Sequence, residues 1–189
     1  MNFNINRRAA IRNMALILGS AAVLPSCLNN DKGKPVVELK NLKIDAEQEN
    51  LVTNLTETIL PKTDSPGAKD LGINLFVFKM IDDCMGKEQQ DDFMRGLDSF
   101  ADEAKKQLGK SFNESTDKER TAFVAAFEKN SKDDKYKDDS KSMAFYKAVK
   151  QQTVFGYTTS KYFMTKQVVY ELVPGRYNAR FPVKKQVTA

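Results

Sequence analysis

Residues 73–85 read Ile-Asn-Leu-Phe-Val-Phe-Lys-Met-Ile-Asp-Asp-Cys-Met, and Gly86 follows at once. Apolar side chains occupy most of this run and leave no continuous polar face. Such a segment is typical of a helix buried in a protein core, and glycine commonly follows a helix end. We therefore predict a buried helix over 73–85 that ends at Gly86, with Cys84 as a small core residue.

Amphipathic segments lie on both sides of this helix in the chain. Residues 87–108 repeat apolar side chains at helical spacing and carry their acidic residues mostly on the other side, which predicts an amphipathic helix. Asp45, with Gln48 three positions later, is the signature of a capping box at a helix start. Apolar residues then recur at helical spacing until Pro61, which ends the second predicted helix.

Two more helices are expected in the second half of the chain. Thr116 and Glu119 form another capping-box pair ahead of apolar residues at helical spacing, and a further apolar segment of helical period leads to Gly156. Residues 61–72 and 171–189 are expected to be long loops, and no alternating strand pattern longer than a few residues occurs. The chain is therefore predicted to be all-α, a single domain of five to seven helices with an irregular C-terminal segment.

The C-terminal stretch 153–181 combines aromatic side chains with two turn signals, Gly156-Tyr157 and Pro174-Gly175. Between them we expect one short helix around residues 161–170. Large aromatic side chains beside glycine and proline indicate a fixed, irregular surface. Two interpretations remain open from the residues alone: a C-terminal segment that packs on the core, or a docking face for another protein.

Five short motifs stand in order along the chain: Leu60-Pro-Lys-Thr-Asp-Ser-Pro-Gly-Ala68, Phe93-Met-Arg-Gly-Leu-Asp98, Gly156-Tyr-Thr-Thr-Ser160, Tyr170 and Val173-Pro-Gly-Arg-Tyr177. Together they resemble the gluconate 2-dehydrogenase subunit 3 family, whose members are small accessory subunits of membrane-bound flavin dehydrogenases. The likeness covers residues 46 to 183, with Thr158 where the family usually has a second tyrosine.

The resemblance implies a non-catalytic small subunit that binds, helps to export and anchors to a membrane a flavin-dependent, GMC-type sugar or sugar-acid dehydrogenase. It implies FAD in that large partner and no cofactor in this chain, and it allows a cytochrome c subunit in the same complex. The alternative is a free-standing helical envelope lipoprotein that binds a ligand or another envelope protein. The candidate partner-binding residues are Pro66, Gly67, Ala68, Gly156, Tyr157, Tyr170, Pro174, Gly175 and Tyr177.

Residues 1–26 have the features of an export signal. Adjacent arginines at Arg7 and Arg8 resemble a twin-arginine signal, an apolar run follows, and Leu-Pro-Ser precedes Cys27 as in a lipobox. The alternatives are a Sec signal with a chance arginine pair, or a core helix. We expect cleavage before Cys27 and its lipidation, a tether over 27–44, and a helical domain over 45–189 on the periplasmic side of an envelope membrane.

Composition excludes several classes of chemistry. The chain has no histidine, which excludes a Ser-His-Asp triad and any haem or zinc site with histidine ligands. Loss of the signal would remove three arginines and no acid, lowering the formal net charge from +5 to +2. Basic and acidic residues then nearly balance, so we expect no nucleic-acid partner. With Cys27 lipidated, Cys84 has no partner for an internal disulfide.

Two groups of charged residues were candidates for a site. Lys62 and Asp64 lie in the predicted loop, where such residues more often cap turns than act on a ligand. Asp82 and Asp83 are adjacent carboxylates, but neighbours on a helix do not converge on one point. No catalytic or metal-binding residue is therefore predicted.

Overall fold

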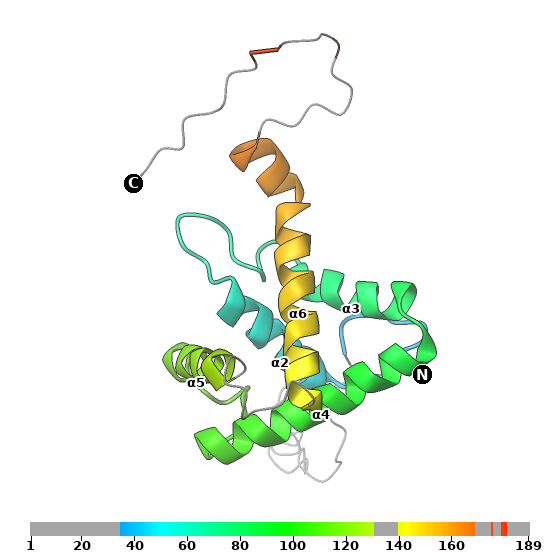
Figure 1. The fold of residues 1–189 in the computed structure, drawn as a ribbon, viewed down its shortest axis with the longest axis vertical. Helices are drawn as coiled ribbons and strands as arrows, with labels where there is room; N and C mark the ends of the chain where they lie inside the picture. The colour runs from blue at the N-terminus through cyan, green and yellow to red at the C-terminus, as the bar shows by residue number, and fades with distance from the viewer. Residues whose placement is uncertain (1–34, 131–139, 169–174, 176–178, 181–189) are drawn as a thin grey trace, which may run out of the picture. The chain divides into compact units, whose positions relative to one another are not determined.

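The computed structural model describes residues 35–130, 140–168, 175 and 179–180. Within these ranges the chain forms five α-helices and one π-helix, and no strand (Figure 1). The all-α prediction is confirmed for this part of the chain. The elements are α2 (Ala46–Ile59), α3 (Ile73–Cys84), α4 (Lys87–Leu108), α5 (Asp117–Asn130), α6 (Lys141–Thr158) and the π-helix η1 (Phe163–Gln167).

Both predicted capping boxes are present. The Asp45 carboxylate accepts from the backbone N–H of Gln48 at 2.8 Å, and the Gln48 side chain accepts from the Asp45 N–H at 3.2 Å. At the start of α5, the Glu119 carboxylate accepts from the Thr116 N–H at 2.7 Å, and the Thr116 hydroxyl accepts in return from the Glu119 N–H at 3.4 Å. These bonds satisfy backbone donors that have no partner within the helix.

Helix α6, yellow to orange in Figure 1, packs against α2, α3 and α4. Its approach to α4 depends on Gly96, where a Cβ atom would lie 2.7 Å from both the Lys141 carbonyl oxygen and the Phe145 Cβ. Separations this short are far inside van der Waals contact. The absence of a side chain at Gly96 therefore lets the first turns of α6 lie directly on α4.

Phe100 of α4 is the centre of an aromatic cluster that joins three helices. Its ring centroid lies between 5.5 and 5.6 Å from those of four other phenylalanines, in tilted or edge-on arrangements. Such geometries are the favoured ones for aromatic pairs. The partners are Phe112 before α5, Phe123 and Phe127 of α5, and Phe145 of α6.

Residues 36–44, here called the N-terminal strap, are attached to the helices. Val37 and Leu42 are buried in the core. The buried Asp82 carboxylate of α3 accepts hydrogen bonds from the backbone N–H groups of three successive strap residues, at 2.7, 2.8 and 2.7 Å. The second half of the expected tether is thus part of the packed domain. The residue that fixes it there is Asp82 of α3, 40 residues after Leu42 in the chain.

Two local expectations differ from the structure. Gly156 and Tyr157 form no turn, because α6 continues to Thr158; Gly156 is needed there for close packing, as described below. Cys84 is exposed rather than buried. The buried positions of α3 end at Asp82, and Cys84, the last residue of the helix, lies beyond them.

Candidate docking surface

The last turns of α6 carry exposed apolar side chains. Val154 and Phe155 retain 51% and 49% of their surface in solvent, although both are large and apolar. They line an open groove of about 690 Å³, here called the α3–α6 groove. The groove is bounded by Met80 of α3 and by Lys147, Lys150, Gln151, Gln152, Val154, Phe155 and Thr158 of α6.

Gly156 positions this part of α6 against α3. A Cβ atom at Gly156 would lie 2.7 Å from the ring of Phe76 and 3.4 Å from the Ile73 side chain. The Phe76 and Phe155 rings are 6.0 Å apart, centroid to centroid. Phe155 is therefore held on one side by α3 and presents its other side to solvent at the rim of the groove.

The π-helix η1 is folded onto the end of α6 by Tyr157. The Tyr157 ring lies 5.3 Å from that of Phe163 and 6.5 Å from that of Tyr162. The Ser160 hydroxyl accepts from the Phe163 N–H at 3.2 Å, as a cap. The short helix predicted after residue 160 is thus present as η1, which ends at Gln167, and Val168 follows with 36% of its surface exposed.

The predicted partner-binding residues of the C-terminal half divide into three groups. Gly156 is buried and Tyr157 is half-buried, and both shape the groove end of α6 rather than face solvent fully. Gly175 is exposed. The other predicted residues of the C-terminal segment, and the predicted lipidation site, lie outside the described residues: Tyr170, Pro174, Tyr177 and Cys27.

The predicted second surface at Pro66-Gly67-Ala68 is mostly internal. Ala68 has no exposed surface, and its N–H donates to the Leu60 carbonyl at 2.9 Å. A Cβ atom at Gly67 would lie 2.6 Å from the Glu57 carboxylate. Gly67 and Ala68 therefore fix the connection from α2 to α3, and only the half-buried Pro66 is open to contact.

Val154 and Phe155 were absent from the predicted set. In the sequence they continue the apolar pattern of the helix before Gly156, so they read as core residues. Their exposure could not be found from spacing, since it depends on which face of α6 the neighbouring helices cover: Thr153 and Gly156 are buried, whereas Val154 and Phe155 are not.

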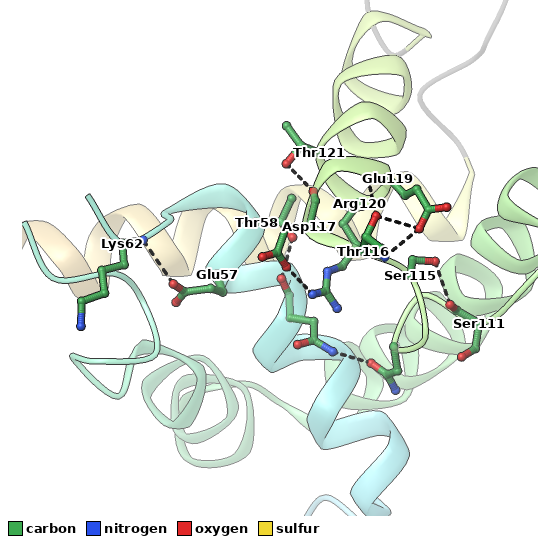
Figure 2. Close-up of polar contacts among 12 residues, drawn as sticks. Glu57, Thr58, Lys62, Ser111, Ser115, Thr116, Asp117, Glu119, Arg120 and Thr121 are labelled. Carbon is green, nitrogen blue, oxygen red and sulfur yellow. Dashed lines mark hydrogen bonds and ion pairs between the residues drawn. The ribbon is translucent and has the colours of Figure 1, made fainter. Parts of the chain in front are cut away.

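A second, polar cleft of about 210 Å³ lies between α2 and α5 and is lined by Glu57, Lys62, Asp117, Arg120 and uncharged neighbours (Figure 2). The Arg120 guanidinium donates to the Asp117 carboxylate at 2.6 Å. The Glu57 carboxylate accepts from the backbone N–H groups of Lys62 and Lys69, at 3.2 and 2.8 Å. The charged groups of this cleft are thus bonded within the domain. Glu57 joins α2 to the following loop, and the Arg120–Asp117 pair lies within α5.

The other charged candidates also have structural partners. Lys62 forms an ion pair with Asp70 at 3.1 Å, and the hydrogen bond from Lys62 holds the pKa of Asp70 below its ordinary value. Asp64 is exposed in the same loop. Of the adjacent carboxylates, Asp82 is bonded to the strap and Asp83 pairs with Lys40 at 3.4 Å.

Neither a metal-ligand cluster nor a membrane-spanning helix occurs among the described residues. No group of three or more potential ligand side chains could hold a metal ion in the described ranges. Among the same residues, no helix is long and apolar enough to cross a membrane.

An exposed apolar groove on a helical domain is typical of surfaces that contact another macromolecule. Comparison with known families identifies the family of this chain. The model of the family described as gluconate 2-dehydrogenase subunit 3 matches residues 46–175, and the chain belongs to this family. The family name denotes an accessory subunit of a dehydrogenase complex. No curated protein and no solved structure matches the chain.

Proposed function

We propose that this protein binds the large, flavin-dependent subunit of a sugar or sugar-acid dehydrogenase through the α3–α6 groove. The observation that carries the proposal is the half exposure of Val154 and Phe155 beside that groove. Exposed apolar side chains grouped at a hollow are typical of protein contact sites. Phe155 is also held against Phe76, so it would lose little side-chain freedom on binding.

The roles of the two subunits follow from this assignment. FAD belongs to the large subunit, where the sugar is oxidised, and the family resemblance allows a cytochrome c subunit in the same complex. This chain supplies no cofactor and no catalytic residue; it contributes to export and attachment. Support for this division comes from the family membership and from the absence of histidine in the sequence.

We propose that the protein is exported by the twin-arginine route and is then attached to an envelope membrane by a lipid on Cys27. The domain would lie on the periplasmic side of that membrane. The strap is bonded to the domain from Val36 onward, since the Val36 N–H donates to the Glu49 carboxylate at 2.6 Å. Eight residues, 28–35, then lie between Cys27 and Val36. The nine steps from residue 27 to residue 36 can span at most about 30 Å. The partner would accordingly be kept close to the membrane surface.

The test is Val154→Asp in the full-length chain, with Val36→Asp as the matched control. Val36 is exposed by 88% and lies outside the groove. Both variants are expressed with a C-terminal tag in the source cell, and the tagged protein is purified from membranes in mild detergent. Flavin absorbance per mole of tagged chain, with mass identification of the flavoprotein, measures the complex.

We expect Val154→Asp to lose the flavoprotein, because a charge in an apolar contact is costly to desolvate, and Val36→Asp to retain it. An unchanged flavin ratio in Val154→Asp would contradict the proposal. Purified subunit alone is expected to bind no flavin and to oxidise no sugar with an artificial acceptor. A gene standing apart from any flavoprotein gene would favour the free-standing lipoprotein instead.

A further inference from the structure

The segment that carries the groove has charge of one sign. From Lys141 to Val168 the chain contains five lysines and no aspartate or glutamate. The whole chain, by contrast, mixes 30 basic and 25 acidic residues. Helix α6 and η1 are therefore a basic region in a protein of nearly balanced charge. The lysines are Lys141, Lys147, Lys150, Lys161 and Lys166.

Two of these lysines, Lys147 and Lys150, line the groove. Lys150 also binds Glu128 of α5 and lies 6.0 Å above the Tyr146 ring, which fixes its position. Lys161, just before η1, and Lys166, within η1, are exposed. Along the chain, Val154 and Phe155 thus stand between two basic pairs, of which the second is fully exposed.

The groove also contains a polar atom without a partner. The side-chain oxygen of Gln152 is buried and accepts no hydrogen bond from any described residue, and Gln152 is one of the lining residues. A buried acceptor of this kind normally has a donor. This acceptor has almost no accessible surface, so it lies beneath the surface that an occupant of the groove would contact.

We propose that the α3–α6 groove binds a protein segment that places an apolar side chain against Val154 and Phe155 and carboxylates opposite Lys161 and Lys166. This inference rests on the proposed function and specifies the chemistry of the partner's contact. Charge complementarity favours an acidic partner surface. The concave groove favours a protruding peptide over the flatter headgroup layer of a membrane.

The direct test is carbodiimide cross-linking of the intact complex purified from membranes. This reagent joins a lysine amine to a carboxylate only where the two are in contact. Mass spectrometry is expected to find peptides that link Lys161 or Lys166 to an aspartate or glutamate of the flavin-containing subunit. Cross-links to that subunit confined to other lysines of this chain would overturn the inference.

A charge-reversal pair gives the second measurement. Lys161→Glu/Lys166→Glu is compared with Lys106→Glu/Lys118→Glu, two exposed lysines on α4 and α5. The first pair should slow association with the flavoprotein about tenfold at low ionic strength, and the difference should shrink at high salt. The control pair should associate like the wild type.

The outcomes separate the two proposals. If Val154→Asp loses the flavoprotein while Lys161→Glu/Lys166→Glu behaves like its control, docking at the groove stands and the acidic partner surface is wrong. If Val154→Asp keeps the flavoprotein, the docking site itself is wrong. Vesicles of phosphatidylcholine with and without phosphatidylglycerol test the membrane alternative. Loss of binding to the anionic vesicles in the lysine pair, with an unchanged flavoprotein complex, would assign the basic region to lipid.

Discussion

At Asp82 one carboxylate holds the N-terminal strap. It accepts from three successive backbone N–H groups, those of Lys40, Asn41 and Leu42. Burial raises the pKa of Asp82, but these three donors outweigh it and hold the pKa below its ordinary value. The side chain therefore stays ionised in the folded protein, where it can accept all three bonds.

Asp82→Ala should lower the free energy of unfolding by about 3 kcal/mol, because it leaves buried backbone donors without an acceptor. Asp83→Ala is the matched control: it removes only a surface pair with Lys40 and should cost under about 1 kcal/mol. Urea unfolding followed by circular dichroism measures both. Equal losses in the two variants would show that the strap bonds contribute little.

The close approach of α4 and α6 at Gly96 gives a second prediction for a single residue. Gly96→Ala should cost about 2 kcal/mol by overpacking, since the new Cβ would meet the backbone of Lys141, which cannot rotate away. Gly86→Ala, where nothing lies closer than 4.0 Å, is the control. Thermal melts compare the two, and a Gly96→Ala protein as stable as Gly86→Ala would refute the close approach of α4 and α6.

Among the elements, α5 begins with a cap that depends on pH. The hydrogen bond with Lys110, then those with the Thr116 N–H and hydroxyl, lower the pKa of Glu119 to about 2 from its ordinary 4.5. The carboxylate thus contributes stability that is present above pH 4.5 and is lost as the pH falls toward about 2.

In Glu119→Gln, the free energy of unfolding should depend less on pH between pH 4.5 and about 2 than it does in the wild type. The wild-type protein should lose stability relative to the variant as the pH is lowered through this window, because only the wild type must protonate a bonded carboxylate. Unfolding free energies at several pH values between 6 and about 2 measure the difference. A constant difference across the window would mean that Glu119 is not held ionised by its cap.

The helices that sequence patterns predict well are those specified locally. The capping pair Asp45 and Gln48 predicts the start of α2, and the predicted range 87–108 coincides with α4. Both signals can be read from the sequence because capping and amphipathic period depend only on residues of the same segment. Gly156 was misread as a turn because its role is set by Phe76 on another helix. Asp82 and the strap are 40 residues apart, so no local pattern could pair them.

The candidate surface was located only in part. Gly156 and Tyr157 were predicted as contacts, and they lie at the groove end of α6, but the exposed residues beside them are Val154 and Phe155. An apolar residue at helical spacing has the same sequence signal whether a neighbour covers it or not. The distinction requires the arrangement of the helices around α6.

At the scale of the whole molecule, the proposed lipid anchor can be tested at Cys27. Cys27→Ala should release the protein from membranes or leave it unprocessed, because lipoprotein maturation acts on the cysteine after a small residue. Membrane fractionation and the mass of the mature chain measure this. A variant that matures normally and stays in the membrane fraction would remove the lipid anchor from the proposal.

The strap also determines how the domain responds to mechanical force. A pull on the chain at residue 35 would first load the bond between the Val36 N–H and Glu49, and then the three bonds that converge on Asp82. Force applied there would therefore enter the helices at two points, α2 at Glu49 and α3 at Asp82, and both helices pack against α6.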